Sequence, residues 1–300
     1  MLGNTSISKL YVGSTEVSKA YLGSTEVYSS EEFLLDTYGS AGFALAFREL
    51  TANRSAFTSI GDTGTQTSGV WNVQVRRSSD NAQKSFTTSE VTDGTLETWV
   101  GTGNDGFVSR WYDQSGNSNH AFQTTTARQP ILVQSGTVSA ENGVPAMRGS
   151  IITDVWLNMT TALAGDESVF SSYRAFYDST LIVRHTGGSA HSMGSRGTTA
   201  NWLYQTNAGS FDLGISHPTS SVVAQFQCIG TAQSVHANDA LVMSRTASAA
   251  NTANIGRIMY YTFQSGGLEN SLTEIVAYTT DKSSDRSNIF ANMNAFYGAY

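Results

Sequence analysis

Cysteine is almost absent from this sequence, whose 300 residues contain one, Cys228. A single cysteine excludes an internal disulfide framework and any cysteine-rich zinc site. Cys228 lies in an alternating apolar segment, residues 222–229. We therefore expect a buried structural thiol there rather than a reactive one.

Charged residues are also scarce, at 14% of the chain, where about a quarter is usual in soluble proteins. The formal net charge is -7 at pH 7. Nucleic acids and anionic lipid surfaces repel a protein of net negative charge. We therefore expect neither nucleic acid nor a membrane as a partner.

Long apolar runs are missing as well. No segment approaches the roughly 18 consecutive apolar residues of a membrane-spanning helix. The N-terminus has no charged segment followed by an apolar run, so we expect no secretory signal peptide. If the protein works outside a cell, release within an assembled particle would fit this pattern.

Ser, Thr, Gly and Asn are abundant, and hydrophobic residues make up 39% of the chain. This composition allows a substantial core and suits short strands joined by many turns. Residues 29–32 favour one short helical turn, and helical spacing is clear only in residues 283–297. That helix would place one set of side chains on its buried face: Ile289, Phe290, Met293, Phe296 and Tyr297.

The spacing of apolar residues and turn signals predicts an all-β sandwich. The expected strands cover residues 44–50, 70–77, 85–88, 96–100, 107–112, 129–133, 145–148, 168–173, 180–184, 202–205, 222–229, 240–245, 255–262 and 272–278. Residues 102–106 are expected to form a hairpin turn rather than a phosphate-binding loop.

The first 27 residues contain a ten-residue repeat. Gly, Thr and a β-branched residue recur at fixed offsets: Gly3/Gly13/Gly23, Thr5/Thr15/Thr25 and Ile7/Val17/Val27. Each unit predicts a short strand, a Gly-Ser/Thr turn and a second strand. Such a small meander cannot bury enough apolar area alone, so we expect residues 1–30 to form an arm that attaches to a partner or to sister chains. The alternative is a sheet packed on the protein's own body. The expected attachment residues are Ile7, Tyr11, Val17, Tyr21 and Val27.

Residues 107–123 predict a strand, a tight polar turn and the entry to another strand. Asp113, Asn117 and Asn119 can accept hydrogen bonds from nearby backbone amides, and Gly116 can take a positive φ. The same oxygen ligands at alternating positions suit calcium, but a site with one carboxylate would be weak. We therefore expect a hydrogen-bonded turn, with a weak calcium site as the alternative, and no other cofactor or metal.

Several short motifs follow one another in fixed order: Leu34–Tyr38, Ala44–Leu50, Val75–Asn81, Trp99–Gly103, Trp111–His120 and Glu141–Ala146. Together they resemble a concanavalin A-like jelly-roll module of phage and bacterial surface proteins, a relative of the catalytic domain of arabinofuranosidase B. Residues 272–297 resemble the closing strand and helix of laminin-G-like lectin domains. Residues 153–251 match no module that we can name.

The ten-residue repeat resembles the N-terminal segments of phage fibre and decoration proteins. Joined to the lectin-like module, it implies a virion surface protein: a head fibre, a capsid decoration protein or a tail fibre component. Residues 1–30 would bind other virion structural proteins, and residues 31–300 would form the displayed sandwich. The resemblance further implies a homotrimer and contact with a host or environmental glycan. A secreted bacterial lectin is a further alternative, and the sequence does not separate head from tail.

The resemblance to arabinofuranosidases also implies a rival function, polysaccharide hydrolysis. A retaining glycosidase needs two carboxyl groups about 5 Å apart. Those enzymes carry a Gly-Gly-Asp motif and a vicinal cysteine pair, whereas the comparable strand here reads Asn254-Ile255-Gly256-Arg257-Ile258. No spacing pairs the acids that remain: Asp113, Glu141, Asp166, Glu167, Glu269 and Glu274. We therefore expect no catalytic residues and a non-enzymatic protein.

The unmatched middle of the chain contains residue types suited to a glycan. Trp202 and Tyr204 fall on one face of an expected strand, with Asp212 and His217 downstream. An exposed aromatic ring can stack on a sugar face, while carboxylate and imidazole groups bind hydroxyls. The alternative is that the face of Trp202 belongs to the core. Trp71, Trp99, Trp111 and Trp156 are expected in the core because of their strand context, and the five histidines have no metal-ligand spacing.

Overall fold

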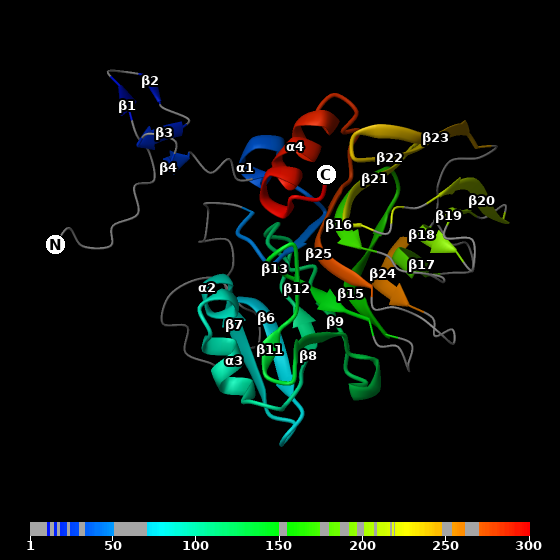
Figure 1. Cartoon of the computed structure of the whole chain (residues 1–300). Coiled ribbons are helices and arrows are strands. Elements are labelled where there is room, and N and C mark those ends of the chain that lie inside the picture. The colour runs from blue at the N-terminus through cyan, green and yellow to red at the C-terminus, as the bar shows by residue number, and fades with distance from the viewer. Residues whose placement is uncertain are drawn as a thin grey trace.

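The protein is a two-sheet β-sandwich with helices over one face (Figure 1). The computed structural model describes residues 11–12, 15–16, 19–22, 25–29, 34–50, 71–149, 155–174, 180–186, 192–196, 201–206, 209–216, 218, 220–247, 254–261 and 270–300. All the strand pairs among these residues are antiparallel, as expected for a jelly roll, in which both sheets are built from returning strands.

The first sheet lies beneath α1 (Leu34–Tyr38) and α4 (Arg286–Tyr297), and we call it the helix-covered sheet. Its strands follow in this spatial order: β23 (Ala240–Thr246), β22 (Ala232–Ala237), β21 (Val222–Ile229), β16 (Glu167–Arg174), β25 (Ser271–Tyr278) and β5 (Phe43–Ala46). The chain therefore brings its first and last sandwich strands, β5 and β25, side by side in the middle of the fold.

The second sheet, which we call the long sheet, packs against the first. Its strands follow in this spatial order: β20 (Gly209–Ser216), β19 (Asn201–Thr206), β18 (Ser192–Arg196), β17 (Thr180–Thr186), β24 (Asn254–Tyr261), β15 (Val155–Ala164), β9 (Ala121–Phe122), β8 (Gly106–Trp111), β6 (Trp71–Arg77) and β7 (Gln83–Thr87).

Short strands join and border the two sheets. β10 (Ile131–Gln134) pairs with β8 of the long sheet and with β14 (Met147–Arg148), which in turn pairs with β25. β11 (Thr137–Val138) pairs with β10, while β12 (Ala140–Glu141) and β13 (Val144–Pro145) form a separate hairpin. These connections close one edge of the sandwich.

The main core lies between the sheets and follows the two-residue period of the strands. On β25, Ile275 and Ala277 face this core, whereas Val276 and Tyr278 face the helices on the other side. All eight residues of β25 are buried because the strand is covered on both faces. On the opposite side of the core, the ring of Trp111 stacks on Phe47 with 4.9 Å between centroids.

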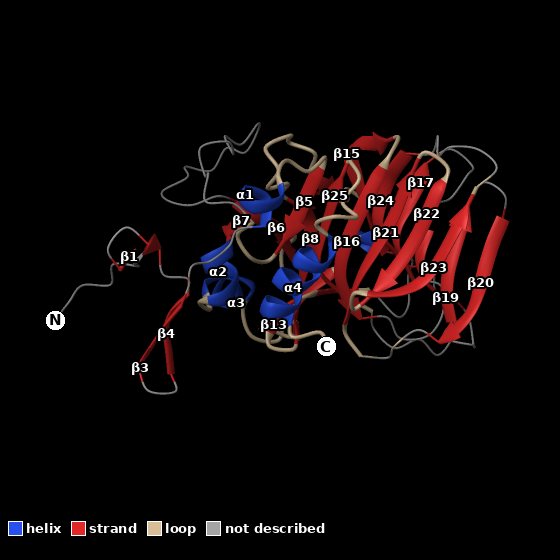
Figure 2. Ribbon diagram, turned by 90° about the horizontal axis from the view of Figure 1, so that it is seen from above, coloured by secondary structure: helices blue, strands red, loops and turns tan. Residues whose placement is uncertain are grey.

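Two helices cover the outer face of the helix-covered sheet (Figure 2). They are α1 (Leu34–Tyr38) and α4 (Arg286–Tyr297); α4 was expected from the sequence, whereas α1 lies after residues 29–32, where only one short turn was expected. Gly298 ends α4 with a φ of +55°, a conformation that glycine adopts without strain. One expected contact is wrong: Phe296 lies at the margin of the apolar stripe in the last turn and is 44% exposed.

Residues 96–100 form a helix rather than the expected strand. α3 (Thr95–Val100) follows α2 (Thr88–Thr92), which begins with a capping box between Thr87 and Glu90. The apolar residues Leu96 and Val100 are four apart and both buried, which fits a helix, whereas five residues are too few to separate this period from alternation. Residues 102–106 accordingly connect α3 to β8 and are not a hairpin turn.

Six of the described strands were not expected from the sequence. They are β11, β12, β15, β18, β20 and β22. The apolar alternation of β15 is interrupted after Met159, and β22 combines small and polar residues, so neither segment has a clear strand signal of its own. Their positions are determined by pairing with neighbouring strands.

The N-terminal arm forms the hairpins that the ten-residue repeat predicts. β1 (Tyr11–Val12) pairs with β2 (Thr15–Glu16), and β3 (Lys19–Leu22) pairs with β4 (Thr25–Ser29). Figure 1 shows these strands set apart from the sandwich. Tyr21 and Val27 lie in strands, as does Tyr11, whereas the predicted attachment residues Ile7 and Val17 lie outside the described residues. In the described part of the chain, no helix is long and apolar enough to cross a membrane.

Candidate functional site

The polar turn between β8 and β9 is a hydrogen-bonded joint. The buried carboxylate of Asp113 accepts four hydrogen bonds, and we list them by donor: the Ala44 amide (2.8 Å), the Ser115 amide (2.9 Å), the Ser115 hydroxyl (2.8 Å) and the Asn119 amide (2.9 Å). Burial raises the pKa of the Asp113 carboxyl, while these hydrogen bonds oppose that rise. One side chain thus organises the turn and holds it to β5.

The two asparagines of the same turn extend the joint to other strands. The Asn117 side-chain amide donates to the Ala41 carbonyl at 2.7 Å, and the Asn119 side-chain oxygen accepts from the Thr161 amide of β15 at 2.8 Å. The oxygens of Asp113 and Asn119 that calcium would need are therefore engaged within the protein. This geometry is that of the hydrogen-bonded turn, the interpretation that the sequence favoured over a calcium site.

His120 also contacts the residues of this joint. Its Nδ1 accepts the Asp113 amide at 3.0 Å, and its ring packs edge-on against Tyr112 with 5.2 Å between centroids. Burial and the positive charge of Arg110 lower the pKa of His120 to about 4. The neutral imidazole is therefore the form that the folded protein stabilises.

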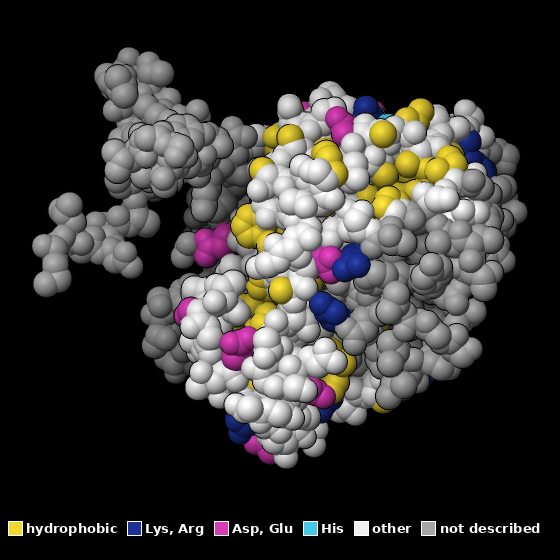
Figure 3. Space-filling model, viewed as in Figure 1, with side chains coloured by type: hydrophobic (Ala, Val, Ile, Leu, Met, Phe, Trp, Pro, Cys, Tyr) yellow, Lys and Arg dark blue, Asp and Glu magenta, His cyan; other side chains and the backbone are white. Residues whose placement is uncertain are grey.

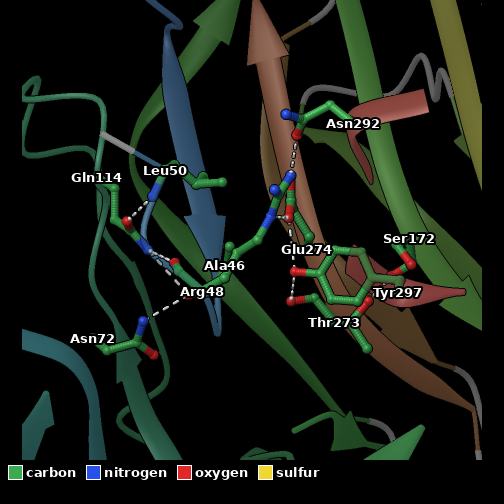
Figure 4. A network of polar contacts seen from close by, with 10 residues as sticks. All are labelled: Ala46, Arg48, Leu50, Asn72, Gln114, Ser172, Thr273, Glu274, Asn292 and Tyr297. Atoms are coloured by element: carbon green, nitrogen blue, oxygen red, sulfur yellow. Dashed lines mark hydrogen bonds and ion pairs between the residues drawn. The ribbon is translucent and has the colours of Figure 1, made fainter. Parts of the chain in front are cut away.

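A second buried acid, Glu274 of β25, is held in a polar network beneath α4 (Figure 4). Arg48 donates to both carboxylate oxygens of Glu274, at 2.6 and 3.1 Å, and also to the Asn292 side-chain oxygen at 2.8 Å. The Tyr297 hydroxyl donates to Glu274 at 2.7 Å. Burial alone would lower the pKa of Arg48, but the charge of Glu274 and its hydrogen bonds raise it, so the guanidinium stays charged.

Two amide side chains hold the backbone that carries Arg48 (Figure 4). Gln114 donates to the carbonyls of Ala46 (3.1 Å) and Arg48 (2.9 Å) and accepts from the Leu50 amide at 2.9 Å. Asn72 donates to the Ala46 carbonyl at 2.7 Å. The network therefore joins β5, β6, the joint and α4, and its acid serves the packing of the fold.

Glu141 is the acid nearest to the surface in this region, with its side chain 10% exposed. It accepts hydrogen bonds from Ser221 (2.9 Å) and Ser271 (3.1 Å), and it pairs with Arg174 at 3.3 Å. A crevice beside it is also lined by Asn142, Ser172, Tyr173, Thr273 and Tyr297. These side chains fill the crevice and leave no room for a water molecule, so no sugar ring can enter it.

The predicted glycan platform around Trp202 is not what the structure shows at that residue. Trp202 is 2% exposed and belongs to the main core, because its face of β19 packs between the sheets. A ring buried in this way cannot stack on a sugar, and the core alternative is the correct one for Trp202. Tyr204 and Asp212 lie in β19 and β20, but their side chains are outside the described part of the structure, as is the whole of His217.

The long sheet brings a different set of residues together on its outer face. A row crosses four strands at paired positions: Arg257 of β24, Asn158 of β15, Phe122 of β9 and Arg110 of β8. Their chain neighbours Ile258, Leu157, Ala121 and Trp111 lie in the main core. Successive side chains of a strand point to opposite faces, so the row faces away from the core, and each member is half-buried.

Trp156 lies beside this row and contacts two arginines. The Arg128 guanidinium carbon lies 4.1 Å from the centre of the indole ring, and that of Arg257 lies 4.7 Å from it. Arg257 also donates to the Asn158 side-chain oxygen at 3.2 Å. The half-buried Trp156 was expected in the core, and it instead lies on the outer face of β15, where it holds cationic groups close together.

Comparison with known proteins gives a fold but no family. No family model matches the sequence, and no curated protein matches it. A GH54 α-L-arabinofuranosidase soaked with a cyclic sulfate inhibitor is similar in structure, with a TM-score of 0.58 and 14% identity over 87% of this chain. An arabinofuranosidase in complex with arabinofuranosyl-α-1,2-xylobiose has a TM-score of 0.51 and 14% identity over 86% of this chain.

The match covers 64% of each arabinofuranosidase, so this chain spans less than two thirds of their length. At this identity the similarity establishes the fold alone. The fold is accordingly the all-β, concanavalin A-like sandwich with a C-terminal helix that the sequence motifs predicted, preceded by the short β-repeat arm.

Removing one partner of the buried Arg48–Glu274 ion pair is expected to destabilise the protein strongly. Arg48→Met leaves the Glu274 carboxylate buried without its cation, which costs about 3–5 kcal/mol of unfolding free energy. Arg286→Met is the matched control, because the Arg286–Asp239 pair is 28% and 35% exposed and worth less than about 1 kcal/mol. Equal losses for the two variants, measured by denaturant unfolding, would contradict this role of Glu274.

The lowered pKa of His120 predicts a pH-dependent stability. The unfolded imidazole takes up a proton near pH 6.5, whereas the folded one does so only near pH 4. Its contribution is therefore complete above pH 6.5 and is lost as the pH falls from 6.5 to about 4. Urea unfolding at several pH values should show a shallower decline across this window for His120→Gln than for the natural protein. An unchanged slope would show that His120 does not titrate in this way.

Proposed function

We propose that this protein is a non-enzymatic virion surface protein that binds carbohydrate through its sandwich. Residues 31–300 form the displayed domain, and residues 1–30 attach it to other structural proteins of a phage particle. The proposed class includes head fibres, capsid decoration proteins and tail fibre components. Three features support it: the sandwich fold, the outer face of the long sheet and the repeat of the arm.

The observation that carries the non-enzymatic part is the engagement of the acids. Glu274 is bound by Arg48 and Tyr297, and Asp113 accepts four hydrogen bonds within the joint. A retaining glycosidase needs a nucleophile and an acid that reach the same sugar, about 5 Å apart. These two carboxylates support the packing of the fold, so neither of them is directed at a sugar.

The carbohydrate part of the proposal is supported by the residue types on the outer face of the long sheet. Carbohydrate recognition uses aromatic surfaces for the apolar faces of sugars and planar amide or guanidinium groups for their oxygens. Phe122, Trp156, Asn158 and Arg257 provide these groups side by side. The arabinofuranosidases of similar fold act on or bind arabinofuranosides, so the sandwich is one that can hold a saccharide.

Hydrolysis of a polysaccharide remains the second candidate, and the similarity to arabinofuranosidases is what favours it. One experiment separates the two functions. The protein is incubated with arabinoxylan and with capsular polysaccharides, and both retention on the immobilised glycan and release of reducing sugar are measured. We expect retention without release. Sugar release that Glu141→Gln or Glu274→Gln abolishes, while the variant remains folded, would make the protein a hydrolase.

Attachment through the arm gives a separate prediction. We propose a homotrimer, because the arm needs partners and the edge strand β23 carries apolar side chains, among them Leu241, which is 61% exposed. Figure 3 shows hydrophobic side chains gathered in the upper right of the view, where β22 and β23 lie in Figure 1. Light scattering should give three times the chain mass of 32.1 kDa, and Tyr21→Asp combined with Val27→Asp should weaken binding to particles lacking the protein. A monomer that does not bind such particles would overturn the virion assignment.

A further inference from the structure

We propose that the outer face of the long sheet is an anion-binding surface whose ligand is a polysaccharide carrying carboxylate or sulfate groups. The surface is defined by Arg110, Phe122, Trp156, Asn158 and Arg257, with Arg128 above Trp156. This inference rests on the proposed carbohydrate binding and names the class of saccharide.

The first argument is the separation of charge within the chain. β8, β9, β15, β24 and the short helix η2 (Thr126–Arg128) together contain three arginines, Arg110, Arg128 and Arg257, and no acidic residue. The chain as a whole has a net charge of -7. A face of positive charge on an acidic protein creates a local potential that attracts anions to that face alone.

The second argument concerns the two arginines at the ends of the row, Arg110 and Arg257. Among the ion pairs of the described residues, none includes Arg110 or Arg257. By contrast, Arg48 donates two hydrogen bonds to Glu274 and one to Asn292, so its guanidinium is used within the fold. The Nε of Arg257 donates to Asn158, and both arginines are half-buried on the outer face of the sheet.

The third argument is the close placement of like charges. The guanidinium groups of Arg128 and Arg257 both lie against the ring of Trp156, at 4.1 and 4.7 Å. Their mutual repulsion opposes this arrangement, and the indole ring partly offsets it through cation–π contacts. An anion bound at either guanidinium would reduce the remaining repulsion. Planar guanidinium groups bind carboxylate and sulfate through paired hydrogen bonds, which a lysine cannot do.

The geometry of the row favours an extended saccharide over a single small anion. Three strand spacings separate Arg257 from Arg110, roughly 14 Å between Cα atoms at about 4.8 Å per spacing. Between them lie an amide, Asn158, and an aromatic ring, Phe122. The arginines at the two ends of the row suit spaced anionic groups on a saccharide chain. The amide between them suits hydroxyl groups, and the aromatic ring suits an apolar sugar face.

The test compares matched charged and neutral polysaccharides on the full-length protein. Dextran sulfate is paired with dextran, and polygalacturonate is paired with arabinoxylan, with single-stranded oligo-dT as the nucleic acid. Binding is measured by titration calorimetry over a series of salt concentrations. We expect the anionic polymers to bind more tightly than their neutral partners. Arg257→Gln and Arg110→Gln should each weaken that binding about ten-fold and lower the salt dependence by about one unit of slope.

Two further variants separate the site from overall charge and from folding. Arg286→Gln removes the same charge from α4, which covers the other sheet, and should leave binding unchanged. Arg257→Lys keeps the charge but lacks the planar fork, so it should bind with intermediate strength. The thermal unfolding midpoint of each variant confirms that the protein remains folded.

The outcomes distinguish this inference from the function on which it rests. Loss of polyanion binding in Arg257→Gln and Arg110→Gln, but not in Arg286→Gln, supports it. Unchanged polyanion binding in all three variants overturns the assigned surface. Binding to arabinoxylan alone overturns the anionic class and leaves carbohydrate binding intact. No binding to any polysaccharide overturns both proposals, and preference for oligo-dT over both anionic polysaccharides overturns the saccharide class.

Discussion

The buried ion pair between Arg48 and Glu274 is the constraint on which the helix-covered side of the protein depends. Glu274 lies in the middle of β25, a strand covered on both faces, so its charge has no access to water. Burying it is tolerable because Arg48, Tyr297 and the residues that position Arg48 satisfy both carboxylate oxygens. The helix α4, the strand β5 and the loop after it are thereby held in one arrangement.

The joint at Asp113 holds the other side of β5 in place. Its carboxylate binds the Ala44 amide, while Gln114, the next residue, binds the backbone on either side of Arg48. The two networks therefore meet on one short strand, and each stabilises the position of the other. This connection explains why Asp113, Gln114 and Asn119 of the polar turn are buried.

The distribution of charge gives the two faces of the sandwich different properties. One face is covered by α1 and α4, and the acid beneath them is neutralised by Arg48. The outer face of the long sheet carries arginines beside aromatic rings. The packing of the buried acids and the proposed anion-binding surface thus belong to opposite faces of the sandwich.

Sequence patterns alone determined the fold class, most strands, the closing helix, the hairpins of the arm and the structural nature of the polar turn, because these depend on local period and turn chemistry. Sequence patterns gave the wrong element at α3, where the apolar pattern is too short to separate a helix from a strand. They also gave the wrong exposure for Trp202 and Phe296, because exposure depends on which layer packs against a residue. Trp202 is buried and Trp156 half-exposed, although both lie in strands of similar character. Only the tertiary structure places Arg257, Asn158, Phe122 and Arg110 in one row. They are far apart in sequence and become neighbours through the pairing register of their strands.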